Sequence, residues 1–324
     1  MIHLTRHLAI TLFLAWPSTI DAMSYDLIVC GQGGDSDYVA RFQEWGLRLR
    51  SVLTDTLDHP ADHIVLLTES GTHSDGTSDR ATVLRRLAEF RARLTPEDHL
   101  FIYLIGHGTY RQMARFNVRG PDLTTEDLVG ALSAVPGHTT LINTASTSAP
   151  FIKALAGPNR TICTSTKSVD EYNATSFAEY FIQGLEDGSA DRDRDDRISI
   201  LEACHNAATL PSASYAAEGI LATEHALIDG DGKERSIRLD AENKLDNHEA
   251  DRVFLKDWSF PDAVPDAWID AYRTAVDSVE VLIRRKNTLE EETYWRELEK
   301  RLLKAARSHR RVREHQIGAA DQKD

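Results

Sequence analysis

The chain has 324 residues, 41% of them hydrophobic, which is long enough for one domain of about 200 residues and an appendage. Its formal net charge of −14 argues against nucleic acid as a partner of the whole chain, because phosphate backbones are bound through an excess of Lys and Arg. An acidic balance of this size is typical of a protein that can bind cations.

The first 22 residues have the pattern of an export signal. Arg6 lies in a short positive segment, LAITLFLAW is a short apolar run, and PSTIDA ends at Ala22, before Met23. The apolar run is too short to span a bilayer. We therefore expect residues 1–22 to be removed and the mature protein to be periplasmic or extracellular, with no transmembrane segment. A hydrophobic first strand or an uncleaved anchor is the alternative.

Residues 23–254 alternate between apolar runs typical of strands and amphipathic runs typical of helices. The expected strands are YDLIVC, HIVLLTE, HLFIYLI, TTLINTAS and RTICTST. The expected helices cover residues 37–57, 81–94, 124–135 and 174–185, and a Thr-x-x-Asp box at Thr124 and Asp127 opens the third. This alternation predicts an α/β fold of three layers, a mostly parallel sheet with helices on both faces.

The region 255–324 is predicted to be helical and contains no strand signal. Its apolar residues recur at spacings of three and four, in a heptad-like stripe: Trp295, Leu298, Leu302, Ala305, His309 and Val312. A helical hairpin packed on the main domain explains this stripe, and a helix-mediated partner is the alternative. The basic cluster near the end, from Arg307 to Arg313, is expected to be a solvated helix end.

Two of the expected strands end in residues suited to hydrolytic chemistry. HLFIYLI runs into Gly106-His107-Gly108, and TTLINTAS ends in Ala145-Ser146, followed by Thr147-Ser148-Ala149. In α/β sheets, catalytic groups lie at the carboxyl ends of the strands, where the loops begin. A histidine and a small nucleophile at neighbouring strand ends indicate a hydrolase layout.

These two motifs resemble those of the caspase-like clan CD cysteine peptidases, nearest the legumain-like family. That family has a strand ending in His-Gly and another ending in Ala-Cys-x-Ser-Gly. His107 matches the catalytic base, whereas Ser146 occupies the cysteine position and Ala149 replaces the glycine. The resemblance covers roughly residues 25 to 230 and implies a caspase-like strand order.

The resemblance also implies roles for further residues. The backbone N–H of Gly108 is the expected oxyanion donor. The segment after the fifth strand corresponds to the wall of the specificity pocket, which makes Ser165, Lys167, Ser168 and Glu171 candidate pocket residues. An ordinary polar loop is the alternative for this segment.

The presence of Ser146 in place of the catalytic cysteine determines whether we expect catalysis. A thiol can be held as a thiolate, but an alcohol needs a base to remove its proton during attack. We therefore expect an exported peptidase homologue with impaired catalysis and a retained peptide-binding cleft. The alternatives are a serine-type hydrolase using Ser146 and His107, an interaction module acting through the C-terminal helices, and a chance arrangement of strand ends. Cys163 is a weaker candidate for a displaced nucleophile.

DRDRDDRISILE, residues 191–202, matches an EF-hand calcium loop. The spacing predicts ligands from alternate residues around one Ca²⁺ ion: Asp191, Asp193, Asp195, Arg197 through its carbonyl, Ser199 and Glu202. Asp196 stands where glycine normally makes the turn. A solvated acidic loop is the alternative. The later Asp229-Gly230-Asp231-Gly232 lacks further ligands and is expected to be a turn.

Overall fold

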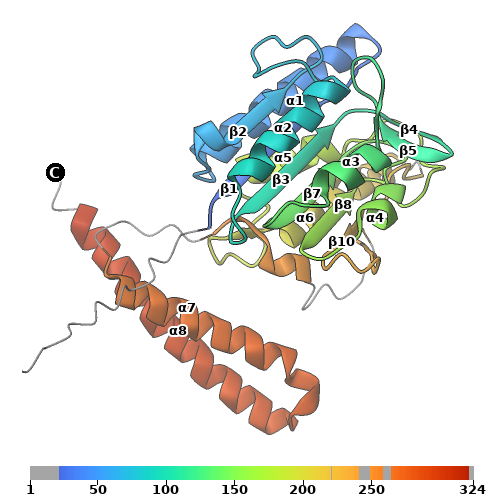
Figure 1. The fold of residues 1–324 in the computed structure, drawn as a ribbon. Coiled ribbons are helices and arrows are strands. Elements are labelled where there is room, and N and C mark those ends of the chain that lie inside the picture. The colour runs from blue at the N-terminus through green and yellow to red at the C-terminus, as the bar shows by residue number, and fades with distance from the viewer. Residues whose placement is uncertain (1–21, 220, 241–248, 258–263, 321–324) are drawn as a thin grey trace, which may run out of the picture.

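The computed structural model describes residues 22–219, 221–240, 249–257 and 264–320. The expected export signal, except Ala22, lies outside the described residues. The centre of the molecule is a seven-stranded sheet in the order β11-β10-β8-β7-β3-β1-β2 (Figure 1). Neighbouring strands from β2 to β8 are parallel, β10 runs antiparallel to β8, and β11 runs antiparallel to β10.

The strands of the central sheet are short and buried. They are β1 (Ser24–Cys30), β2 (Ile64–Leu67), β3 (His99–Ile105), β7 (His138–Asn143), β8 (Arg160–Thr164), β10 (Leu227–Asp229) and β11 (Ile237–Arg238). The three-residue 3₁₀ turn Ala61–His63 leads into β2.

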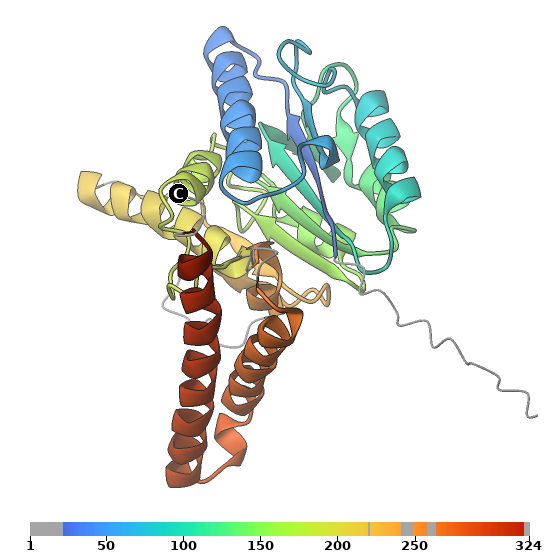
Figure 2. The same cartoon turned by 90° about the vertical axis from the view of Figure 1, so that its left-hand side faces the viewer.

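Helices cover both faces of the sheet (Figure 2). One face packs against α1 (Ser36–Asp55), α5 (Phe177–Glu186) and α6 (Ile200–Glu218). The other packs against α2 (Arg80–Arg93), α3 (Thr125–Leu132) and α4 (Pro150–Leu155). This arrangement confirms the expected three-layer α/β fold with a mostly parallel sheet.

Local sequence explains where the helices begin and why they pack closely. The Asp35 side chain caps α1, and Thr124 forms the expected capping box with Asp127 at α3. Gly46 lets α1 approach the sheet, because a Cβ there would lie 2.4 Å from the Cys30 sulfur. The helix faces then bury their apolar stripes against the strands, which is the main stabilising term.

Several short strands were not predicted. A three-stranded ribbon follows β3 and consists of β4 (Gly108–Arg111), β5 (Met113–Phe116) and β6 (Leu123–Thr124). A two-stranded sheet joins β9 (Ile198–Ser199) to β12 (Phe254–Lys256), next to the 3₁₀ turn Glu249–Arg252. The expectation that no strand follows residue 254 is therefore wrong. Strands of two to four residues are too short to show alternation in sequence.

The C-terminal region forms the predicted helical hairpin, but its two helices pack chiefly on each other and not, as expected, on the main domain. It consists of α7 (Asp266–Arg284), the 3₁₀ turn Lys286–Thr288 and α8 (Glu291–Ala320), and it projects from the sheet domain (Figures 1 and 2). Its core contains Val264, Tyr272 and Val312. Trp295 is 51% exposed and Leu302 is 49% exposed, so these two members of the expected stripe are not buried between the helices.

Within the described residues, every helix is too short or too polar to cross a bilayer.

Candidate active site and candidate metal loop

The ends of β3 and β7 bring the two sequence motifs together. The strands are parallel neighbours, with Leu104 paired to Asn143, so the His107-Gly108 and Ala145-Ser146 segments leave the sheet at the same edge. A Cβ built on Gly108 would lie 2.3 Å from the Ser146 carbonyl oxygen. Glycine is therefore required at this position for the two strand ends to pack against each other.

Ser146 and Gly108 are joined by two hydrogen bonds. The Gly108 N–H donates to the Ser146 Oγ at 3.3 Å, and the Ser146 hydroxyl donates to the Gly108 carbonyl at 3.2 Å. Ser146 is only 3% exposed. The next residue, Thr147, has a φ of 53°, an uncommon backbone conformation for a β-branched residue. The hydroxyl therefore lies in a tight turn, beside the backbone N–H expected to be the oxyanion donor.

His107 is held on the other side of the same segment. Its ring packs edge-on against Tyr38 at 4.5 Å and Phe42 at 5.0 Å, both from α1. Burial lowers the pKa of His107, although the carboxylate of Asp35 and a hydrogen bond to the backbone of Gly33 oppose that shift. The imidazole is therefore neutral near pH 7, the form that a general base requires.

The hydrogen bonds of this pair do not form a Ser-to-His relay. The Ser146 hydroxyl donates to the Gly108 carbonyl and accepts from the Gly108 N–H, and among the described residues no hydrogen bond joins it to the ring of His107. A serine nucleophile needs its hydroxyl hydrogen bonded to the base that removes the proton. The arrangement thus places the two groups at one edge of the sheet without coupling them for attack.

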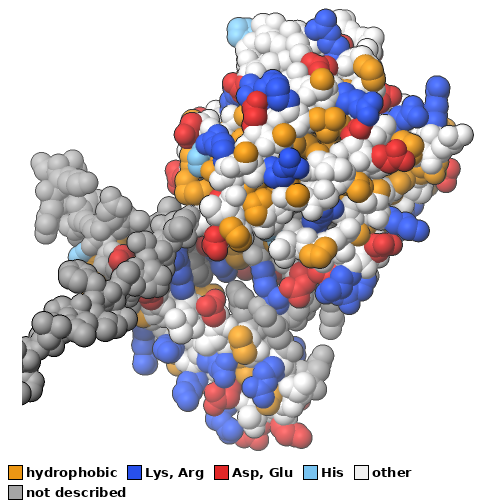
Figure 3. Space-filling model, in the orientation of Figure 1, with side chains coloured by type: hydrophobic (Ala, Val, Ile, Leu, Met, Phe, Trp, Pro, Cys, Tyr) orange, Lys and Arg blue, Asp and Glu red, His pale blue; other side chains and the backbone are white. Residues whose placement is uncertain are grey.

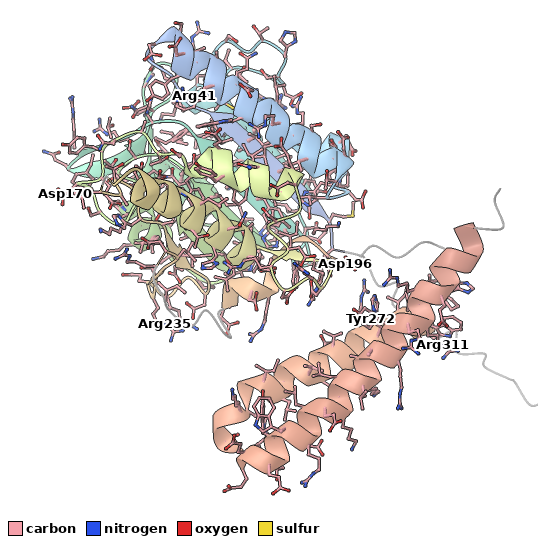
Figure 4. The ribbon with its side chains drawn as sticks, turned by 180° about the vertical axis from the view of Figure 1, so that it is seen from behind. Arg41, Asp170, Asp196, Arg235, Tyr272 and Arg311 are labelled. Carbon is pink, nitrogen blue, oxygen red and sulfur yellow. The ribbon has the colours of Figure 1, made fainter. Side chains whose placement is uncertain are left out.

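Three of the four expected pocket residues contact the end of β7 or one another. Ser165 Oγ donates to the Ala145 carbonyl at 2.8 Å, and the Lys167 N–H donates to Glu171 Oε2 at 2.8 Å. The Glu171 carbonyl accepts from the Thr147 N–H at 2.9 Å, which ties the loop to the turn after Ser146. Ser168 lies farther along this loop, where its hydroxyl accepts from the Asp170 N–H at 3.2 Å; Figure 4 marks Asp170 at the outer edge.

A charged cluster beside this loop was not predicted as a unit. His225 pairs with Glu171, and its other ring nitrogen lies 4.0 Å from Asp240, which also pairs with Arg238. These residues come from the entry to β10 and the end of β11, so they extend the polar edge across the sheet. Only the tertiary pairing of distant segments brings them together, and the sequence carries no local signal for it.

Glu224 caps the start of α5. Its carboxylate accepts from the backbone N–H groups of Ser176 and Phe177 at the start of α5, at 2.9 to 3.1 Å. Burial raises its pKa. A carboxylate at this position satisfies free N–H groups of the first helical turn and interacts favourably with the helix dipole.

The cysteines do not supply a nucleophile. Cys30, Cys163 and Cys204 are all buried free thiols. Burial raises the pKa of Cys163 well above its usual value, so its reactive thiolate form is disfavoured. Cys163, in β8, is therefore a buried side chain of the hydrophobic core.

The candidate calcium loop holds its aspartates close together. Carboxylate oxygens of Asp191, Asp193 and Asp195 lie within 4.8 Å of one another. Glu202, in the first turn of α6, reaches back to accept from the Arg192 N–H at 3.0 Å, so the first and last parts of the loop meet. Asp196 has a φ of 67°, the left-handed conformation for which glycine is favoured at this position.

Like charges crowd this loop. Burial, followed by the carboxylates of Asp195, Glu202 and Asp191, raises the pKa of Asp193 to about 6. The guanidinium of Arg197 offsets part of this charge, because it pairs with Asp195 at 2.7 Å and lies over the Phe254 ring. A divalent cation would neutralise the remaining carboxylates. The spacing of the oxygens and the shape of the loop thus fit Ca²⁺.

The loop is also anchored to the rest of the domain. Ser199 Oγ donates to Asp251 Oδ1 at 3.1 Å and to Glu202 Oε2 at 2.9 Å. The strand β9 that contains Ser199 pairs with β12. Figure 4 shows Asp196 on the side of the domain toward the hairpin, near Tyr272, and burial with the charge of Asp195 raises the pKa of Tyr272 to about 12.

Comparison with known proteins gives no family. No family model matches the chain, and no curated protein matches it. Among solved structures, a match is found to protein GSU0716 from Geobacter sulfurreducens, at 9% identity and a TM-score of 0.36. That match covers 51% of this chain and 83% of the other.

Proposed function

We propose that this chain is an exported caspase-like peptidase homologue, nearest the legumain-like family, that binds peptide segments at the β3–β7 edge and does not cleave them. The observation that carries the proposal is the state of Ser146. Ser146 is almost fully buried, and its hydroxyl is hydrogen bonded to the Gly108 backbone and not to the ring of His107. A site with a base and an oxyanion donor but no activated nucleophile favours binding over turnover.

The surroundings of Ser146 support a peptidase origin for the site. Gly108 cannot carry a side chain beside Ser146, and its N–H lies 3.3 Å from the Ser146 Oγ, where an oxyanion donor is needed near a nucleophile. The parallel order of β2, β1, β3, β7 and β8, with an antiparallel β10, is compatible with the caspase-like order. Peptide would lie against Ser165 and Glu171, which border this turn.

A bound Ca²⁺ ion is the second part of the proposal. Asp191, Asp193, Asp195 and Glu202 would supply carboxylate oxygens, with the Arg197 carbonyl and Ser199 completing the set. The ion would neutralise the crowded carboxylates and stabilise the junction of α5, α6 and β12. This role is structural, because the loop is not part of the β3–β7 edge.

The decisive test replaces Ser146 by cysteine, which places a thiol at the position of the family's nucleophile. In Ser146→Cys, we expect labelling by a peptidyl acyloxymethyl ketone, because His107 can help to form a thiolate. Adding His107→Ala to this variant should reduce labelling by at least about 100-fold. Wild type should react with neither this probe nor a serine-directed fluorophosphonate.

Two outcomes would contradict the proposal. Fluorophosphonate labelling of wild-type Ser146 that is lost in His107→Ala would establish the serine hydrolase instead. A folded Ser146→Cys protein that shows no His107-dependent labelling would remove the peptidase kinship. Ser148→Cys, in the same turn and also buried, is the matched control for accidental thiol reactivity.

A further inference from the structure

The outer side of α8 combines cationic and large apolar side chains that nothing in the proposed peptide site uses. Residues 300 to 313 contain seven Lys and Arg residues and no Asp or Glu, although the whole chain has a net charge of −14. Positive charge is thus concentrated on one helix of an acidic protein. Such separation of charge indicates an anionic partner for that helix.

The cations form a continuous stripe. Their spacing of four, four, three and four residues places them on one helix face: Arg296, Lys300, Lys304, Arg307 and Arg311. All five are exposed. Val312 lies on another face of the helix and is buried against Tyr272 of α7, and Arg311, at the end of the stripe, lies over the Trp268 ring of α7. The hairpin projects from the sheet domain (Figures 1 and 2).

Large apolar side chains occupy the rest of the exposed surface of α8: Leu303 lies next to the cationic stripe, and Trp295 and Leu302 lie on the far side of Leu303 from it. Trp295 is 51% exposed, and Leu302 and Leu303 are each 49% exposed. Trp295 and Leu302 are seven residues apart and therefore share a face, next to Ala306. Figure 3 shows Lys and Arg side chains distributed over the projecting hairpin, with hydrophobic side chains between them.

We propose that α8 docks on the surface of an anionic phospholipid bilayer. Lys and Arg would interact with the lipid headgroups, while Trp295, Leu302 and Leu303 would enter the boundary between headgroups and acyl chains. The apolar residues favour this partner over a nucleic acid, because a phosphate backbone offers no apolar layer for a tryptophan and two leucines. The stripe spans about four helical turns, enough to lie along the membrane plane.

The test measures binding of the full chain to sedimenting vesicles. With vesicles of equal parts phosphatidylglycerol and phosphatidylcholine, we expect binding that weakens as NaCl rises from about 50 to 500 mM, because salt screens the charges. Pure phosphatidylcholine vesicles should bind the protein only weakly.

Variants separate the contribution of the cationic side chains from that of the apolar side chains. Lys300→Glu/Lys304→Glu/Arg307→Glu should reduce binding by about 100-fold, because each basic residue near an anionic membrane contributes about fivefold or more. Leu302→Ser/Leu303→Ser should reduce binding while leaving helix content unchanged, since both side chains are half exposed. The matched control, Arg91→Glu/Arg111→Glu/Lys153→Glu, makes the same charge change at exposed sites of the sheet domain and should bind like wild type.

Several results would overturn the proposal. These are equal binding to neutral and anionic vesicles, equal loss of binding in the sheet-domain control, or tighter binding to a DNA duplex than to anionic vesicles. Circular dichroism of each variant shows whether the hairpin is folded. Membrane binding by α8 does not depend on Ser146, so the membrane proposal can be refuted or supported separately from the peptidase proposal.

Discussion

The buried side chain of His59 is hydrogen bonded to two segments that are far apart in the chain. Its Nδ1 lies 2.7 Å from the Asp26 carboxylate, and its Nε2 lies 2.6 Å from the Leu255 carbonyl. Tyr103 also donates to Asp26, at 3.1 Å. Both partners of the imidazole are acceptors, so the ring is an imidazolium with two N–H donors.

The environment of His59 supports that charge. Burial alone would lower its pKa, but the nearby Asp26 carboxylate and the Leu255 carbonyl raise the pKa above its ordinary value. Leu255 belongs to β12, which pairs with β9 in the calcium loop. One buried cation therefore connects the central sheet to the strand that supports the loop.

We predict that His59→Phe lowers the free energy of unfolding by about 3 kcal/mol at pH 6, because Asp26 is left buried without its counter-ion. The folded-state pKa of His59 is raised, so its stabilisation is present at low pH and is lost as pH rises through that pKa. Urea unfolding from pH 6 to pH 9 should show that the difference in the free energy of unfolding between wild type and His59→Phe becomes smaller as the pH rises. His73→Gln, at an exposed site, is the control and should show no gap; a constant gap would contradict the buried imidazolium.

At the scale of elements, the candidate calcium loop is a folded unit assembled from two segments. Residues 191–202 supply the oxygens, and β12 with Asp251 fixes the end of the loop through β9 and Ser199. The guanidinium of Arg197 pairs with Asp195 and so competes with a metal ion for this carboxylate. The positive φ of Asp196 costs backbone strain that glycine at this position would avoid. Both features favour modest affinity for Ca²⁺.

We predict that wild type binds Ca²⁺ with a Kd on the order of 0.1 to 1 mM and is stabilised by it. Glu202→Gln should weaken binding by at least about tenfold, because it removes the carboxylate of the last loop position. Isothermal titration and the thermal midpoint with and without Ca²⁺ measure these effects. Glu179→Gln, an exposed change on α5, is the matched control. Identical binding by wild type and Glu202→Gln would eliminate the site.

At the scale of the whole molecule, the sheet domain and the hairpin have separate cores. The sheet is enclosed by two large clusters of buried side chains, one on each face. The hairpin has its own small cluster, Val264, Tyr272 and Val312, and α7 packs chiefly on α8. Near the junction, Tyr272 approaches the loop that contains Asp195 and Asp196. Separate cores indicate that the sheet domain can fold without the hairpin.

Deleting residues 264–324 is predicted to leave a monomeric, cooperatively unfolding sheet domain whose thermal midpoint falls by no more than about 4 °C. The reason is that the deletion removes little of either sheet-face core. Near-UV circular dichroism and thermal unfolding of the truncated chain test this expectation. Loss of cooperativity or aggregation of the truncated chain would show that the two cores depend on each other.

The sequence by itself determined the parallel strands, the main helices and the capping box of α3, because apolar periodicity and side-chain caps act over a few residues. It also placed Gly108 and Ser146 at neighbouring strand ends and gave the spacing of the aspartates from Asp191 to Asp195. It did not reveal the short strands β4 to β6 and β9 to β12, since two to four residues carry no periodic signal.

Only the tertiary structure decided how the candidate site is connected. Whether Ser146 bonds to His107 or to Gly108 depends on a turn at Thr147 and on the packing of Phe42 from α1, which local sequence does not specify. The same holds for His225 with Glu171, and for His59 with Leu255, whose partners are far apart in the chain. The physical reason is that hydrogen bonds between distant segments are selected by the packing of the whole core.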